Sequence, residues 1–387
     1  MADRAEVASR AAEGLRRFAS SAGAVPVLVG FDGFVDSIIQ VVDKRHDMQR
    51  YEPVRTIETF GQRIVDAAGQ SANFELVTTL QKLGGNGPIM ANALAAAGLQ
   101  VNYVGALGLP DLHPVFEDFA RHASVHSISE PGYTDALEFA DGKLLLGKHA
   151  TLMGVDQQHI DDHVGRATFD KLAAGSRLIG MVNWTMLPKV EAIWQDLIER
   201  VLPGAPATVA GRRRLIFIDL ADPAKRTDDD IRRALKLCGQ LNEHADVVLG
   251  VNLKEAGQVA RVLDVAVTGD AEAAIETTAC GIRRAMDLHC VVIHPRRGAA
   301  AAMCGEDQAE AASASFAGPF VSEPKLSTGA GDNFNAGFCL GLLADLDIEQ
   351  ALCAGTATSG YYVRQGQSPS LEQLAEFCDR LPEPQLV

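Results

Sequence analysis

The sequence lacks two features that mark whole classes of protein, a paired-cysteine motif and an excess of basic charge. Its seven cysteines form no CxxC pair, and all of them lie in the C-terminal half, mostly among apolar neighbours. This odd and widely spaced set disfavours a secreted disulfide framework, so we expect reduced thiols in the core of a cytoplasmic protein. The net charge of −15 argues against nucleic acid or an anionic membrane surface as the main partner.

Long apolar runs and a dinucleotide-binding glycine pattern are also missing. No stretch approaches the length of a membrane span, and acidic Asp3, Glu6 and Glu13 stand where a signal or transit peptide would be basic. The first apolar run is not followed by G-x-G-x-x-G, which argues against an NAD-dependent dehydrogenase. The 387 residues, 47% of them hydrophobic, suffice for one large α/β domain or two ordinary ones.

Short apolar runs alternate with helical patterns along most of the chain. The runs lie at 25–29, 101–107, 178–184, 215–220, 247–249 and 291–293, with helical patterns such as 190–201 and 228–241 between them. Continuous runs of this length are typical of strands that are buried on both faces. The alternation therefore predicts a doubly wound, mostly parallel sheet with helices on both faces and with functional residues at the carboxyl ends of its strands.

A second, smaller sheet is predicted where the strand–helix alternation is interrupted. Strand-like runs at 126–129, 136–139 and 144–146 follow one another closely, and Asp141-Gly142 predicts a hairpin turn between the last two. We expect a small β-sheet lid formed by residues from about 31–45 and 124–150, within a single domain that spans residues 1–387.

The most informative stretch is 326–343, LSTGAGDNFNAGFCLGLL. Gly329, Ala330 and Gly331 precede Asp332, and an apolar, small-residue helix follows. A helix that opens in this way presents unpaired backbone N–H groups and the positive end of its dipole, which suits a phosphate. Asp332, in the first turn, is placed to take a proton from a hydroxyl beside that phosphate. A glycine-rich turn into a buried helix is the alternative interpretation.

Two further polar stretches lie in the first quarter of the chain, one directly after a predicted strand and one at the start of a predicted helix. Asp32 and Asp36 come directly after the run at 25–29, where exposed strand-end carboxylates are the plain alternative. Gly84, Gly85 and Asn86 open a helix with proline just inside its start. A glycine pair at this position brings backbone close to a ligand or serves only tight packing.

Three candidate contacts to a metal ion, a phosphate or a purine lie in the C-terminal half. Asn252 and Glu255 have the spacing of an ordinary helix capping box, which is a strong structural alternative to a metal or phosphate site. Arg296, just before Gly298, stands in a basic loop that either touches a phosphate or is simply solvated. Gly355 belongs to a small-residue helix at 351–361 that suits a flat purine, although close helix packing explains it equally well.

These motifs, in this order, resemble those of the PfkB (ribokinase-like) carbohydrate kinases. The resemblance rests on the GAGD segment at Gly329 to Asp332, the Gly84-Gly85 pair and the Asn-x-x-Glu motif at Asn252, and it extends over nearly the whole chain. It implies a Mg²⁺-dependent transfer of the γ-phosphoryl group of ATP to a hydroxyl of a sugar or sugar-like (nucleoside-like) acceptor. Asp332 is then the general base, and the backbone of Gly329, Ala330 and Gly331 forms the anion hole.

The same resemblance assigns the remaining site residues. Asp36, Asp32, Gly84, Gly85 and Asn86 are expected to bind the acceptor substrate. Glu255 and Asn252 are expected at the metal, through water, and beside the nucleotide. Arg296, Gly298 and Gly355 complete the expected nucleotide site.

Several departures from the family pattern keep alternatives open. Leu326 and Ser327 replace the usual Asp-Thr pair, so a monovalent-cation site is not assigned. The form GGNGPIMAN and the presence of His294 are features shared with the ADP-dependent sugar kinases, so ADP stands as the alternative donor. A non-catalytic sugar-binding regulator is the alternative from another class, although such a protein needs neither Asp332 nor Glu255. The sequence leaves the identity of the acceptor and a homodimeric state open.

Overall fold

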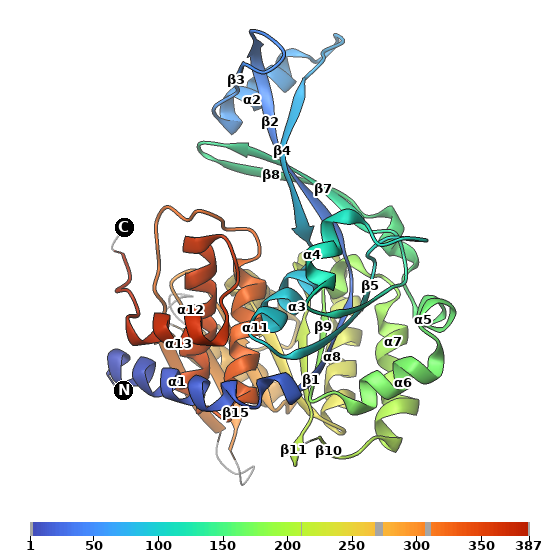
Figure 1. Cartoon of the computed structure of the whole chain (residues 1–387), viewed down its shortest axis with the longest axis vertical. Helices are drawn as coiled ribbons and strands as arrows, with labels where there is room; N and C mark the ends of the chain where they lie inside the picture. Colours follow the sequence, from blue (N-terminus) through green and yellow to red (C-terminus); the bar gives the residue numbers. More distant parts are fainter. Residues whose placement is uncertain (1–2, 210, 268–273, 306–310, 386–387) are drawn as a thin grey trace.

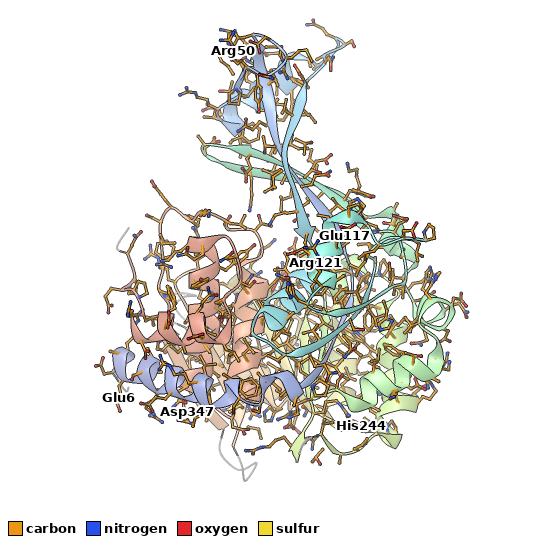
Figure 2. All side chains as sticks on the ribbon, in the orientation of Figure 1. Glu6, Arg50, Glu117, Arg121, His244 and Asp347 are labelled. Atoms are coloured by element: carbon orange, nitrogen blue, oxygen red, sulfur yellow. The ribbon has the colours of Figure 1, made fainter. Side chains whose placement is uncertain are left out.

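The computed structural model describes residues 3–209, 211–267, 274–305 and 311–385. Figure 1 shows a broad body of helices around a central sheet, from which a narrow β-sheet projects upward as a lid. In Figure 2, Arg50 lies at the outer end of this lid. Glu117 and Arg121, at the two ends of α4 (Glu117–Ala120), lie nearer the point where the lid meets the body.

The body is organised around a nine-stranded sheet in the order β16-β15-β14-β13-β12-β9-β1-β5-β6. The strands from β14 to β6 run parallel, whereas β15 and β16 are antiparallel to their neighbours. The strand bounds are β1 Pro26–Phe31, β5 Gln100–Gly105, β6 Ser124–Ser127, β9 Leu178–Val182, β12 Leu215–Asp219, β13 Asp246–Val251, β14 Cys290–Ile293, β15 Gly298–Cys304 and β16 Ala311–Ala317.

Helices cover both faces of this sheet, and alternating strand residues supply one core on each side. In β1, Val27 and Val29 belong to one core while Leu28 belongs to the other. The first core packs against α1 (Arg4–Ala19), α3 (Asn86–Ala96), α11 (Ala330–Leu343), α12 (Ile348–Gln365) and α13 (Leu371–Asp379). The second packs against α6 (Arg166–Gly175), α7 (Val190–Asp196), α8 (Asp228–Asn242), α9 (Leu253–Val262) and α10 (Ile275–Met286). The predicted doubly wound fold is confirmed.

The lid is a five-stranded sheet with a small apolar cluster of its own. Its elements are β2 (Phe34–Arg45), β3 (Tyr51–Pro53), α2 (Ile57–Asp66), β4 (Leu76–Gly84), β7 (Gly132–Phe139) and β8 (Gly142–Lys148). The rings of Phe60 and Phe139 stack with centroids 5.6 Å apart, and Ile39, Val41 and Leu137 pack beside them. Because β2 runs from the body to the outer part of the lid, its first residues lie directly at the junction.

The boundaries predicted for the lid, 31–45 and 124–150, are wrong in two respects. Ser124–Ser127 forms β6, which pairs with β5 at the edge of the body sheet, and Phe31 is the last residue of β1. The lid also contains β3, α2 and β4, which the prediction lacked. The four residues of β6 are too few to show a pattern that identifies the partner strand. The strand β4 is largely exposed, so it lacks the apolar run that would predict a strand.

The cysteines and the helices bear on two further predictions. All seven cysteines are free thiols, and five of them are buried in the cores, as expected. Within the described residues, no helix combines the length and apolar character needed to cross a membrane.

Candidate active site

The N-terminus of α11 has the geometry expected of an anion-binding turn. Gly329 adopts a left-handed backbone with φ of 92°, and a Cβ there would lie 3.1 Å from Ile89 and Tyr362. Ala330 N–H donates to the Ser327 carbonyl at 3.3 Å, whereas the N–H groups of Gly331 and Asp332 have no partner among the described residues. The N–H of Gly329 likewise has no partner among the described residues, so the amides free to bind an anion are those of Gly329, Gly331 and Asp332, whereas that of Ala330 is occupied.

Asp332 is buried beside this turn, with 8% of its surface exposed. Asn86 Nδ2 donates to its Oδ1 at 2.8 Å, across 246 residues of sequence. Burial raises the pKa of Asp332 to about 7, and the nearby charges of Asp32 and Asp36 add to this effect. A carboxyl group with such a pKa exchanges a proton readily near neutral pH, which is the property that a general base requires.

Asp32 holds the start of α3 together and does not line a cavity. It is fully buried, and its carboxylate accepts from the N–H groups of Asn86 (3.0 Å) and Gly87 (2.9 Å) and from Asn183 Nδ2 (2.6 Å). Burial raises its pKa to about 6. The structure thus gives Asp32 a positioning role toward Asn86, in place of the substrate contact predicted from the sequence.

Asp36, the third residue of β2, lines a cleft from the lid side. It lies opposite Lys82 of β4 and Thr134 of β7 in the strand register and is 6% exposed. A Cβ on Gly84 would lie within 2.5 Å of the Asp36 carboxylate oxygens, so the glycine pair leaves room for this side chain. Burial raises the pKa of Asp36, and the charge of Lys82 opposes that shift.

A cavity of about 380 Å³ separates Asp36 from Asp332. The lid contributes Phe34, Asp36, Thr134, Leu145 and Gly147, followed by His149, whose ring lies edge-on to Phe34. The body contributes Gly85, Asn86, Ile89, Asn183, Met186, Ala221, Asp222, Lys225, Glu255, Thr328, Gly329 and Asp332. We call this space the acceptor cavity, because its size and polar lining suit a small polyhydroxylated molecule.

Three non-glycine residues of the acceptor cavity have left-handed backbones. Asn183 follows β9 with φ of 63°, and Ala221 and Asp222 follow β12 with φ of 55° and 60°. Such conformations cost of order 1–3 kcal/mol each and concentrate at functional sites. The strain therefore supports a functional role for the carboxyl ends of these two strands.

Asn252 and Glu255 form the predicted capping box, and Glu255 also lines the acceptor cavity. Asn252 Oδ1 accepts from Glu255 N–H at 3.0 Å, and Glu255 Oε2 accepts from Asn252 N–H at 2.9 Å. The other oxygen of Glu255 accepts from Asp222 N–H at 2.7 Å. Burial raises the pKa of Glu255. The capping box is confirmed, and it fixes a buried carboxylate at the wall of the acceptor cavity; the metal role of the motif stays a prediction.

Asp219 is a buried carboxyl group outside the set of site residues predicted from the sequence. It ends β12, and its oxygens accept from Ala221 N–H and from Asn335 Nδ2, each at 2.8 Å. Burial raises its pKa well above the usual range, and the neighbouring charges of Glu255 and Asp332 raise it further. The pairing of Asp219 with Asn335 depends on long-range packing, because the two residues lie 116 residues apart in the chain.

The oxygen-rich wall formed by Asp219, Glu255 and Asn335 fits a divalent cation such as Mg²⁺ in its chemistry. Asn335 Oδ1 is buried without a hydrogen-bond partner. Among the described residues, however, no three His, Cys, Asp or Glu side chains are grouped closely enough to hold a metal ion by themselves. This arrangement suits Mg²⁺, which keeps most of its waters and shares substrate phosphates as ligands.

On the other side of the α11 N-terminus lie two adjoining cavities of about 460 and 690 Å³. Both include Asn252, His294 and Arg296, and the smaller one includes Gly298, Ala330 and Gly331. Its far wall comes from Thr356, Ser359, Gly360 and Val363 of α12. We call the smaller space the donor cavity, because Arg296 and Gly298, which the sequence predicts for the nucleotide site, line it.

Gly355 is not brought to the donor cavity lining. A Cβ there would lie 2.8 Å from the Phe334 ring, so this glycine makes room for that ring. The ring of His294 also stacks against Phe334, with the two ring centroids 4.7 Å apart. Burial lowers the pKa of His294 to about 4, which keeps the imidazole neutral at physiological pH. Other residues of the predicted helix line the donor cavity in place of Gly355, and purine binding by this helix stays a prediction.

Comparisons with known proteins agree with this geometry. The fold is shared with adenosine kinase from Sinorhizobium meliloti (15% identity, TM-score 0.58, covering 92% of this chain and 99% of that chain). It is also shared with Arabidopsis thaliana ribokinase complexed with ribose and ATP (15%, TM-score 0.60, covering 92% and 98%). A parallel sheet with a β-sheet lid defines the fold as ribokinase-like. A match to a family of sugar kinases makes this chain a PfkB-type carbohydrate kinase.

The particular family follows from closer relatives. The family model for prokaryotic ketohexokinase matches residues 3–381, and the ketohexokinase of Haloferax volcanii is 31% identical over 356 residues, covering 91% of this chain and 90% of that protein. The chain belongs to the prokaryotic ketohexokinase family. It is accordingly a phosphotransferase with an alcohol group as acceptor, and the comparisons give no support to the ADP-dependent alternative.

Proposed function

We propose that this protein transfers the γ-phosphoryl group of ATP to a hydroxyl of a ketohexose, with Mg²⁺, in one kinase unit formed by the body and the lid. The observation that carries the proposal is Asp332, a buried carboxyl group whose pKa is raised to about 7, at a helix N-terminus between the acceptor and donor cavities. The choice of a ketohexose rests on the ketohexokinase relative, and the choice of ATP rests on the ribokinase neighbour.

The reaction assigns one role to each side of the α11 N-terminus. Asp332 takes the proton of the attacking hydroxyl, the hydroxyl oxygen forms a bond to the γ-phosphorus, and the bond from that phosphorus to the β-phosphate oxygen breaks, releasing ADP. The unpaired N–H groups of this turn, those of Gly329, Gly331 and Asp332, stabilise the charge of the transferred group, while Ala330 N–H holds the turn through Ser327. Asn86 holds the Asp332 side chain through the 2.8 Å hydrogen bond.

Glu255 and Asn252 are proposed to hold Mg²⁺ through water, with Asp219 behind them. The ion would neutralise charge on the donor phosphates when bound. Glu255 is suited to this because both of its oxygens are fixed by backbone N–H groups and retain free lone pairs toward the cavity.

Replacing Glu255 by glutamine is expected to raise the Mg²⁺ concentration needed for half-maximal rate by roughly 10-fold, the usual cost of a lost outer-shell partner. Acceptor KM should change little, because both oxygens of Glu255 are already held by backbone N–H groups, although the side chain lies at the wall of the acceptor cavity. The measurement is a Mg²⁺ titration of kcat at saturating substrates. Asp230→Asn is the matched control, since Asp230 completes a second capping box on α8. A fall in melting temperature with unchanged Mg²⁺ dependence would show that Glu255 is a helix cap only.

The substrates are tested by a matrix of two donors and four acceptors. We expect ATP with fructose, a ketohexose, to give a kcat/KM at least about 10-fold above its aldose isomer glucose, ribose or adenosine, since a built polar site discriminates by a few kcal/mol. ADP should give no turnover once adenylate kinase is removed. Faster turnover with ADP would overturn the donor assignment, and preferred phosphorylation of adenosine or ribose would overturn the acceptor assignment.

A further inference from the structure

A lysine of the lid, Lys143, contacts the segment that leads into α11. Lys143 is the second residue of β8, directly after the β7–β8 turn, and Figure 1 shows this hairpin reaching sideways from the lid over the body. Its Nζ donates to Ser327 Oγ at 3.1 Å and to Thr328 Oγ1. Both partners belong to the segment immediately before Gly329.

The two partners of Lys143 lie on different cavities. Ser327 lines the donor cavity, together with Lys143 itself, Ala330 and Gly331. Thr328 lines the acceptor cavity, together with Asp332. The Lys143 ammonium group therefore stands at the boundary that a phosphoryl group crosses as it passes from donor to acceptor.

The charge of Lys143 is not cancelled by its contacts. Both of its hydrogen-bond partners are neutral hydroxyl groups. Burial lowers its pKa, the positive charge of Lys82 lowers it further, and Glu138 and Asp36 oppose the shift. An ammonium group carries three N–H donors, of which two are occupied here, so one remains for an anion.

The surrounding site needs such a charge. Asp36, Asp219, Glu255 and Asp332 are all buried around the two cavities, and the whole chain carries a net charge of −15. A donor nucleotide adds further negative charge, so it must be bound by local donors. Lys82 is the other half-buried lid lysine, but it lies opposite Asp36 in the strand register, on the acceptor side.

We propose that Lys143 is a catalytic residue that donates its remaining N–H to an oxygen of the transferred phosphoryl group. This rests on the proposed function, since it assumes phosphoryl transfer between these two cavities. As the bond to the β-phosphate breaks and the bond to the acceptor oxygen forms, Lys143 stabilises the charge on the phosphoryl oxygens from the lid side. The amides of Gly331 and Asp332 do so from the body side. Lid closure is thereby coupled to the chemical step.

The test compares Lys143→Met with Lys148→Met, an exposed lysine of the same strand that pairs with Asp135. We expect Lys143→Met to lower kcat roughly 10²-fold, the usual cost of one lost donor to the reacting anion, with acceptor KM within about threefold. Lys143→Arg should recover part of the loss. Lys148→Met should keep the wild-type kcat.

A second readout separates a contact with the transferred group from a simple lid latch. Calorimetry should show that Lys143→Met binds the β,γ-imido analogue of ATP roughly 10-fold more weakly while ADP affinity stays within about twofold, because only the former carries the γ-phosphoryl group. Equal weakening of both nucleotides, or a kcat within threefold of wild type, would overturn the assignment. If the wild-type protein does not use ATP and a ketohexose, that failure appears in the wild type, and the comparison is repeated with the pair that it does turn over.

Discussion

Asp332→Asn is expected to reduce kcat by roughly 10²–10⁴-fold, the usual contribution of a positioned general base. Asparagine has the same shape and keeps a hydrogen-bonding group near Asn86, but it cannot take the proton of the acceptor hydroxyl. The fold and the nucleotide affinity should therefore be preserved. Initial rates give kcat, and calorimetry with ADP checks the affinity. Asp345→Asn serves as a control, because Asp345 lies just past the end of the same helix and pairs with Arg212 at the surface.

The pH dependence sharpens this test. Burial raises the pKa of Asp332 to about 7, so the free enzyme holds the base in its protonated, inactive form at lower pH. The wild-type kcat/KM should therefore fall as the pH decreases through about 7, and Asp332→Asn should lose this limb of the profile. A variant that retains more than about a third of the wild-type kcat would remove Asp332 from the role of base.

Asp36→Ala is expected to weaken acceptor kcat/KM by roughly 2–4 kcal/mol, the cost of leaving polar groups unpaired in a closed site. Asp36 faces the acceptor cavity from the lid, where an ionised carboxylate accepts hydrogen bonds from two adjacent hydroxyls. Donor binding should be unchanged, because Asp36 does not line the donor cavity. Steady-state rates over a range of acceptor concentrations, with calorimetry for the nucleotide, separate the two effects.

Asp43→Ala is the matched control for this variant. Asp43 lies on the same strand, β2, but pairs with Arg63 in the outer part of the lid. It should leave acceptor kinetics unchanged. If Asp36→Ala also leaves acceptor kcat/KM unchanged, Asp36 is a structural carboxylate of the lid, and the acceptor half of the proposed site is wrong.

The features that could be predicted from the sequence are those whose cause is local. The GAGD turn, the capping box of Asn252 and Glu255, and the apolar strands are each specified by residues that are close in the chain. Asp219 is missing from the predicted site because its partner Asn335 comes from a distant helix. Lys143 was missed as a site residue because, within an exposed strand, nothing local distinguishes it from Lys148.

Asp32 and Asp36 show the same limit at short range. They are four residues apart and have the same side chain, yet one is fully enclosed by α3 and Asn183 while the other lines the acceptor cavity. The difference is set by the point at which the chain leaves β1 and enters β2, and by the register of β2 with β4. Neither is visible in a list of residue types, because register depends on the partner strand.

The division of the cavity walls between lid and body bears on how such enzymes diversify. The donor cavity takes Lys143 from the lid and its other lining residues from the body, whereas the acceptor cavity takes Asp36, Thr134, Leu145 and Gly147 from the lid. Substitutions in the lid can therefore alter which hydroxyl compound fits while the donor machinery on the body stays intact. Proteins of the same fold, named as adenosine kinase and ribokinase, differ in the acceptor that their names state. We expect Lys143 to be the lid residue least free to change when the acceptor changes, because it is the lid residue that lines the donor cavity.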